Sequence, residues 1–327
     1  MTFVRSKRFL AALYITAAAL LAPTPAAAVD GTKRVALVIG NSAYRSVAAL
    51  TNPVNDATDI ARKLGSLGFE VILATDADQA QMRTLIDDFR SKLTRDYVGL
   101  VFYAGHGVTV NGESFLLPVD VPTVIELDAK GQMTVETLNK YLISMASMLD
   151  PLEASKLGIV FLDACRTNAA EPGRGVQFQV VSTDTKRAVP IMRGTGSVQV
   201  KQSPHSAGVF RAYATQLDNV ASDGAGRNSP FTKALLKHID TKGISIQELM
   251  IRVRKSVMED TSNVQIPWEE AALNDNFYFI SPSLPGPAGL GPQRTTAGPR
   301  PAGDKRSGGG SRNNLPPNIG MGVGAGF

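Results

Sequence analysis

Two short segments of the sequence hold side chains that can carry out nucleophilic chemistry. His106 stands between Gly105 and Gly107, and glycine leaves the room that a substrate needs close to an imidazole. Cys165 is the only cysteine of the 327 residues. A cysteine and a histidine that are distant in sequence can form a nucleophile and base pair when the fold brings them together. These two residues are therefore the first candidates for catalysis.

The hydrophobic pattern around these segments predicts alternating strands and helices. Continuous apolar runs that end at polar or glycine residues are typical of strands buried on both faces. We expect helices capped by Asn55 and Ser229, and a longer one with residues 135, 138, 142 and 145 inward. This order predicts an α/β fold of three layers, with a mostly parallel sheet between helices. The expected strands are residues 34–40, 69–74, 97–103, 157–162, 209–214 and 277–280.

The two reactive residues follow two consecutive central strands of this predicted sheet. In open parallel sheets, ligands bind beyond the carboxyl ends of the strands. His106 comes three residues after the strand expected at 97–103, and Cys165 three residues after the strand expected at 157–162. We therefore expect both side chains at the same edge of the sheet, close enough to act as a pair.

The two ends of the chain differ in composition from its body. Residues 1–28 combine a positive start, a run of 14 apolar residues at 9–22 and three alanines at 26–28, which together predict a cleaved signal peptide. Residues 281–327 contain 12 Gly and 8 Pro and are expected to be disordered. The mature protein is then exported, periplasmic or secreted. The apolar run is too short to span a membrane by itself. We expect no membrane span once the signal is removed.

Charge excludes one large class of function. The formal net charge of +5 resides in the ends: residues 1–28 contribute +3, residues 281–327 contribute +4, and the body 29–280 has −2. A nucleic-acid-binding domain carries its basic patch on the folded body, so we expect no nucleic-acid partner. The three histidines show no metal-ligand spacing, and no serine-hydrolase elbow or phosphate-binding loop is present.

The two reactive segments resemble the signature motifs of a known family. Tyr-Ala-Gly-His-Gly at 103–107 and Asp-Ala-Cys-Arg at 163–166 are similar to the histidine and cysteine motifs of caspase-like cysteine peptidases, most closely the bacterial branch related to metacaspases. The resemblance extends over about residues 34–280 and implies the caspase/hemoglobinase fold. Within the domain 29–280 it implies a large-subunit-like part 34–166, a processing loop 167–206 and a small-subunit-like part 207–280. Segments 38–41, 52–57, 227–232 and 267–269 support it.

The resemblance implies a role for each residue of the two motifs. Cys165 attacks the scissile carbonyl, and His106 protonates the leaving amine and then activates water. The backbone amides of Gly107 and Cys165 form the oxyanion hole. No side chain is evident that would orient the imidazole, and in this family a backbone carbonyl usually does so.

Substrate choice depends on two acidic residues. Animal caspases have glutamine two residues before the nucleophile and use basic residues to bind aspartate at P1, whereas this chain has Asp163 there. Asp56 falls where metacaspases place the other acid of the S1 pocket. Together they imply protein or peptide substrates with Arg or Lys at P1. The alternatives are a solvated strand end for Asp163 and a helix N-terminal charge for Asp56.

The resemblance also bears on processing and on metal ions. A loop with several basic residues is compatible with self-cleavage after a basic residue, and Lys186-Arg187 is the expected site. Metacaspases that bind calcium use clusters of acids, of which this chain matches only Asp120. Glu136 and Glu171 add too few oxygen ligands for a hard cation. We therefore expect no cofactor, with calcium as the one metal ion left open.

Two functions of different class remain at this point. One is an exported cysteine endopeptidase of the caspase/metacaspase type that cleaves after Arg or Lys. The other is a catalytically weak or inactive caspase-like module that binds partners. The presence of both His106 and Cys165 favours the enzyme, because a scaffold requires neither. Metacaspases are usually monomeric, so the resemblance implies a monomer.

Overall fold

The computed structural model describes most of the body of the chain. The described residues are 31–110, 113–126, 128, 132–165, 177–181, 188–193, 208–215 and 226–282, and for Cys165, 177–181 and 188–193 the description is limited to the backbone. The expected signal peptide, the tail 283–327 and the expected self-cleavage site Lys186-Arg187 lie outside this range.

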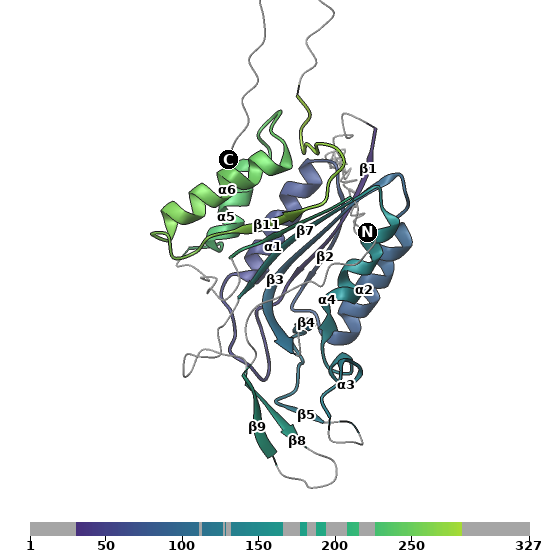
Figure 1. Cartoon of the computed structure of the whole chain (residues 1–327), viewed down its shortest axis with the longest axis vertical. Helices are drawn as coiled ribbons and strands as arrows, with labels where there is room; N and C mark the ends of the chain where they lie inside the picture. Colours follow the sequence, from purple (N-terminus) through teal and green to yellow (C-terminus); the bar gives the residue numbers. More distant parts are fainter. Residues whose placement is uncertain are drawn as a thin grey trace, which may run out of the picture. The chain divides into compact units, whose positions relative to one another are not determined.

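A mostly parallel sheet forms the centre of the molecule (Figure 1). Its main strands follow the order β11-β10-β7-β3-β1-β2, and β11 is the one antiparallel strand on this path. The parallel pairs join β2 to β1, β1 to β3, β3 to β7 and β7 to β10. The bounds are β1 Lys33–Gly40, β2 Glu70–Thr75, β3 Tyr97–Val110, β7 Leu157–Cys165, β10 Val209–Tyr213 and β11 Trp268–Ala271.

Helices cover both faces of this sheet (Figure 1). The strand β1 contributes to both layers: Val38 belongs to the buried cluster that includes α1, α5 and α6, and Leu37 and Ile39 belong to the one that includes α2, α4 and η1. Its apolar run is continuous because each face of the strand meets a helix layer. The expected three-layer α/β fold is confirmed. The helices are α1 Pro53–Ser66, α2 Gln79–Lys92, α4 Met145–Leu149, η1 Asp150–Ala154, α5 Pro230–His238 and α6 Ile246–Asp260.

Local sequence signals place most helix starts. Ser229 caps α5 as expected, with its hydroxyl accepting the Thr232 N–H at 3.0 Å. The cap expected at Asn55 is wrong, because α1 already begins at Pro53, directly after Asn52. Proline suits the first helical turn, where its missing N–H has no intrahelical partner.

Three segments differ from the sequence expectation. The single helix expected around 135–145 is two short helices, α3 Val135–Asn139 and α4, separated by β6 Ile143–Ser144. Residues 277–280 form no strand, although Phe277 and Phe279 are buried. The segment 167–206, expected to lack regular elements, contains β8 Gln177–Val181 and β9 Ala188–Arg193, which form a separate sheet with β5 Val124–Glu126. The remaining strand, β4 Glu113–Leu116, pairs with β3 and β6.

Close packing of α1 against the end of β1 requires a glycine. A Cβ built at Gly40 would lie 2.1 Å from the Pro53 carbonyl oxygen and 2.6 Å from the Ala57 Cβ. Both neighbours are fixed, one as backbone and the other as a side chain too short to move aside. The helix that carries Asp56 therefore lies directly against the strand.

We predict that Gly40→Ala lowers the free energy of unfolding by about 1–3 kcal/mol, the usual cost of overpacking. Gly65→Ala is the matched control, because a Cβ at this position in α1 meets nothing within 4 Å. Alanine there should leave stability unchanged or raise it by about 0.5–1 kcal/mol. Urea denaturation of both variants measures the difference. Equal stability of the two would contradict this packing.

Candidate active site

The register of the central strands places His106 opposite Cys165. The pairing of β1 with β3 ends at Gly40 and Ala104, whereas β3 and β7 remain paired for two further residues, to His106 and Cys165. Neighbouring parallel strands lie about 4.8 Å apart, so these two backbones are adjacent. The two residues therefore lie side by side, as expected, but His106 does not follow its strand: β3 continues past it to Val110, whereas Cys165 is the last residue of β7.

The imidazole of His106 is buried and held on both sides. Its Nε2 lies 2.8 Å from the Ala48 carbonyl oxygen, and the Tyr44 ring stacks at 4.6 Å between centroids, tilted by 50°. Only 5% of the residue is exposed. A carbonyl oxygen can only accept, so Nε2 carries the proton of the neutral imidazole and Nδ1 is its basic nitrogen. The orienting group is thus a backbone carbonyl.

Two tyrosine hydroxyls fix the backbone at His106. The Tyr44 hydroxyl accepts the His106 N–H at 2.8 Å, and the Tyr103 hydroxyl lies 2.8 Å from the His106 carbonyl oxygen and 3.1 Å from that of Leu117. Gly105, which precedes His106, has a φ of +152°, and a Cβ built on it would lie 2.6 Å from the Tyr44 hydroxyl oxygen. The glycine beside the histidine therefore makes space for these hydroxyls.

The loop after β1, which supplies Tyr44 and Ala48, is itself anchored. Asp76 stands at φ +53° after β2, and its Oδ1 accepts the N–H groups of Ser42 at 2.7 Å and Ala43 at 2.8 Å. The fully buried Asn41 accepts the Ala77 N–H and donates to the Leu117 carbonyl. Side chains at the ends of β1 and β2 thus position the groups that hold His106.

The Gly107 amide faces the β7 side of its strand. The Leu117 N–H donates to the His106 carbonyl, so Gly107 and Leu116 form a non-hydrogen-bonded pair of the β3–β4 ladder. The backbone polar groups of Gly107 consequently point away from β4, toward the strand that ends at Cys165. An oxyanion between these two residues would lie within reach of both.

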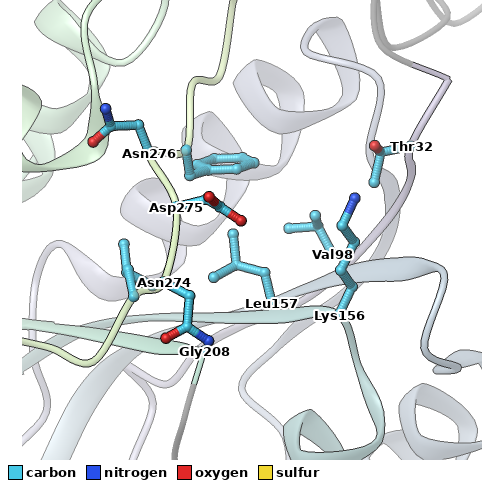
Figure 2. A pocket seen from close by; sticks show the side chains of 10 residues that line it. Thr32, Val98, Lys156, Leu157, Gly208, Asn274, Asp275 and Asn276 are labelled. Carbon is cyan, nitrogen blue, oxygen red and sulfur yellow. The ribbon is translucent and has the colours of Figure 1, made fainter.

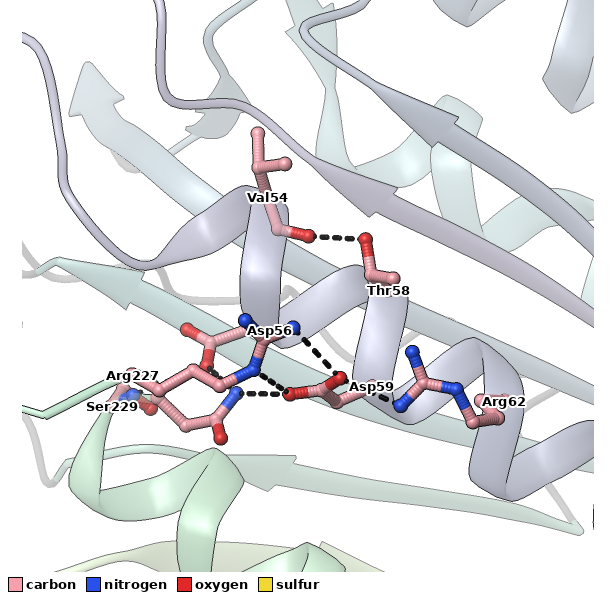
Figure 3. Close-up of polar contacts among 8 residues, drawn as sticks. Val54, Asp56, Thr58, Asp59, Arg62, Arg227 and Ser229 are labelled. Carbon is pink, nitrogen blue, oxygen red and sulfur yellow. Dashed lines mark hydrogen bonds and ion pairs between the residues drawn. The ribbon is translucent and has the colours of Figure 1, made fainter.

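Ser229 donates a hydrogen bond to each of the two expected S1 acids, and Figure 3 shows it beside Asp56. The Ser229 N–H donates to Asp56 Oδ1 at 3.1 Å, and its hydroxyl donates to Asp163 Oδ2. Thr232 also donates to Asp163, at 2.6 Å, and Asn228 donates to Asp56, at 3.0 Å. Both carboxylates are buried, with 1% and 7% of the residue exposed. Asp163 is therefore not a solvated strand end.

A third carboxylate lies beside this pair. Asp59, one turn after Asp56 on α1, accepts two hydrogen bonds from the Arg227 guanidinium, at 2.8 and 3.1 Å, and further ones from Asn228 and Arg62 (Figure 3). Arg227, opposed by partial burial, lowers the pKa of Asp59 from 3.8 to about 2, with Asn228 and Arg62 adding to the effect. Asp59 in turn raises the pKa of Arg227.

Other features of the described residues lie apart from this site. A cavity of about 230 Å³ opens at the amino ends of β3 and β7, beside Lys156, Asn274 and Asp275 (Figure 2). It is at the opposite end of the strands from His106. Asp120, the one match to the calcium-binding acids, accepts the Gln79 N–H at the start of α2. Among the described residues, no helix is long and apolar enough to cross a membrane.

Comparison with known proteins now places the chain in a family. A family model described as "Caspase domain" matches residues 33–278. This chain belongs to the caspase-domain peptidase family.

Individual relatives of this caspase-domain chain match over shorter stretches or at lower identity. The human mucosa-associated lymphoid tissue lymphoma translocation protein 1 is 39% identical over 89 residues, and its mouse homologue is 37% identical over 89. These stretches are 27% of this chain and 11% of each relative, so the chain spans a small part of their length. Caspase-1 from Spodoptera frugiperda has a TM-score of 0.49 at 15% identity, covering 76% of this chain and 90% of its own. The narrower bacterial branch stays a prediction.

Sequence reasoning missed the residues that hold the site together. The family resemblance includes the segment 227–232, but no sequence pattern identifies Asp59, Arg227 or Asn228 individually. One signal was available: α1 carries Asp56 and Asp59 at a spacing of three, which places both on one helix face. Tyr44 gave no signal, because its contact with His106 depends on a loop.

We predict that Tyr103→Phe lowers the free energy of unfolding by about 1–2 kcal/mol, because it removes the one hydroxyl proton that lies between the buried carbonyl oxygens of His106 and Leu117. The control is Tyr278→Phe, which removes a hydroxyl from a half-buried tyrosine outside the network around His106. Thermal and urea unfolding of both variants provide the measurement. A Tyr103→Phe protein as stable as the control would show that this hydroxyl contributes nothing.

A second prediction follows from the ionisation of Asp59. Since its pKa in the folded protein is below the ordinary value, its charge stabilises the fold above about pH 4, and this contribution is lost as pH falls from 3.8 toward about 2. Asp59→Asn should lower stability at pH 7 by about 1 kcal/mol, as expected for a partly exposed pair. The deficit should shrink on acidification. Asp87→Asn, at an exposed position of α2, is the control and should show no such trend.

Proposed function

We propose that the protein is an exported cysteine endopeptidase in which Cys165 is the nucleophile and His106 the acid and base, and which cleaves after Arg or Lys. The observation that carries this proposal is the register of β3 and β7, which pairs His106 with Cys165 at the edge of the sheet. Membership of a peptidase family supports the same reaction class.

The proposed reaction proceeds by acyl transfer. The Cys165 thiolate forms a bond to the scissile carbonyl carbon, and the electron pair of the carbonyl moves to its oxygen. The imidazolium of His106 protonates the leaving amine from Nδ1, since Nε2 is held by the Ala48 carbonyl. A thioester remains, and His106 then takes a proton from the water that hydrolyses it. The Gly107 and Cys165 amides stabilise the oxyanion in both steps.

The proposed specificity is based on two buried carboxylates. Asp56 on α1 and Asp163 on β7 both accept a hydrogen bond from Ser229. These hydrogen bonds offset the cost of burying a charged carboxylate. A guanidinium or ammonium at P1 would complement two negative charges, whereas an aspartate would be repelled. This favours substrates with a basic P1 residue.

Several parts of the proposal concern residues outside the described range. Export depends on residues 1–28, and self-processing at Lys186-Arg187 depends on the segment between β8 and β9. A monomeric state, and activity without calcium or another cofactor, are likewise predictions. The need for calcium can be tested in the activity assay, and the monomeric state by sedimentation of the same protein.

The test uses fluorogenic peptides that differ only at P1, with Arg, Lys or Asp. Protein beginning at Val29 is assayed with reductant, with calcium or a chelator, and beside Cys165→Ala. We expect cleavage after Arg and Lys, none after Asp, no effect of the chelator, and a loss of at least 10³-fold in Cys165→Ala, roughly the contribution of a catalytic nucleophile. Analytical ultracentrifugation of the same protein tests the monomer.

The other outcomes are equally informative. Cleavage after Asp would contradict the assignment of Asp56 and Asp163 while leaving the catalytic pair intact. A complete lack of Cys165-dependent turnover would contradict the enzyme and favour the alternative, a caspase-like binding module.

A further inference from the structure

The segment 227–229 contacts three acidic residues from two elements, Asp56 and Asp59 of α1 and Asp163 of β7. Arg227 contacts Asp59, Asn228 contacts both Asp59 and Asp56, and Ser229 contacts Asp56 (Figure 3). Ser229 also contacts Asp163. The partners are separated by 66 to 173 residues in sequence. Three consecutive residues thus connect α1 to the end of β7.

The contacts along this segment differ in how strongly they can constrain it. Arg227 donates two hydrogen bonds to Asp59, one from Nε and one from Nη2, each to a different carboxylate oxygen. Such a bidentate pair fixes direction as well as distance. Asn228 makes single bonds at 3.0 and 3.1 Å. The Arg227–Asp59 pair is therefore the firmest attachment of the segment to α1.

The charges of this pair persist over the working range of pH. Asp59 has 11% of its side chain exposed and is ionised at any pH well above about 2. Arg227 is 58% exposed, so substitution there leaves no buried cavity. The Arg227–Asp59 pair therefore acts by holding the segment 227–229 in place. The protein should still fold when the pair is removed.

We propose that Arg227 and Asp59 are positioning residues for substrate specificity: by fixing the segment 227–229 against α1, they set the separation of Asp56 and Asp163. This inference rests on the proposed function, because it concerns the S1 acids of that function. Neither Arg227 nor Asp59 touches the substrate. Their effect reaches it through Asn228 and Ser229, which hold the two carboxylates.

The matched control is Arg62. Its Nη1 also donates to Asp59, at 2.9 Å, and its side chain is 71% exposed. Arg62 lies on α1 itself, three residues from Asp59, so its contact does not cross to the segment 227–229. Arg62→Ala and Arg227→Ala thus each remove one cation from the same carboxylate, and only the second releases the segment.

The experiment measures KM and kcat on the Arg-P1 peptide for the wild type, Arg227→Ala, Arg227→Lys and Arg62→Ala. In Arg227→Ala we expect KM to rise on the order of tenfold, with kcat within about twofold, because misplaced binding groups weaken substrate binding. Arg227→Lys keeps the charge without the bidentate geometry and should recover part of the loss. Arg62→Ala should behave as the wild type. The alkylation rate of Cys165 should be unchanged in all four proteins.

The outcomes separate this inference from the proposed function. A wild type that does not cleave after Arg or Lys overturns the proposed function and this inference with it. A wild type that does, with Arg227→Ala unchanged, or with Arg62→Ala equally impaired, overturns only the inference. A fall in kcat at constant KM would also overturn it. If Arg227→Ala fails to fold, Arg227→Lys decides, and wild-type KM in that variant would count against the inference.

Discussion

The continued pairing of β3 with β7 is the constraint on which the candidate site depends. Because β1 stops pairing at Gly40, its following loop is free to turn back over the edge of the sheet, while β3 and β7 extend two residues further. The hydrogen-bonded ladder places the His106 and Cys165 backbones side by side, and the Tyr44 hydroxyl from the loop after β1 also accepts the His106 N–H. The loop after β1 then adds Ala48 and Tyr44, which decide how the imidazole is oriented. The paired strands β3 and β7 set the distance between the His106 and Cys165 backbones, and the loop anchored by Asp76 sets the orientation of the imidazole.

Burial of charge explains the arrangement of Asp56 and Asp163 around Ser229. A carboxylate that loses its water needs hydrogen-bond donors in exchange. Asp56 takes these donors from the Ser229 N–H and the Asn228 amide, and Asp163 takes them from the hydroxyls of Ser229 and Thr232 at the start of α5. Ser229 therefore does two things, since it caps α5 and connects α1 to β7. The requirement to satisfy buried acids thus connects the start of α5 to α1 and to the end of β7.

Sequence alone could predict what depends on periodicity and on strand order. Continuous apolar runs indicated the parallel strands, and the end of each strand located His106 and Cys165. Contacts made by side chains across long sequence separations gave no such pattern. Arg227 and Asp59 are 168 residues apart, and nothing in either local sequence identifies the other. The expected helix around 135–145 failed for a related reason: β6 interrupts it to pair with β4, and this tertiary pairing outweighs helical spacing. The apolar residues Phe277 and Phe279 are buried without forming a strand. The Phe279 carbonyl accepts a hydrogen bond from Arg34 instead of one from a neighbouring strand.

The central claim is that His106 and Cys165 act on each other, and the reactivity of the thiol tests it most directly. Cys165 is the only cysteine, so iodoacetamide alkylation followed by mass spectrometry reports on this residue alone. The account predicts that the wild type is alkylated near neutral pH severalfold faster than the His106→Gln variant, because a nearby imidazolium favours the thiolate. The two proteins should converge at alkaline pH, where the thiol ionises unaided. Identical rates at every pH would contradict the pairing of these two residues.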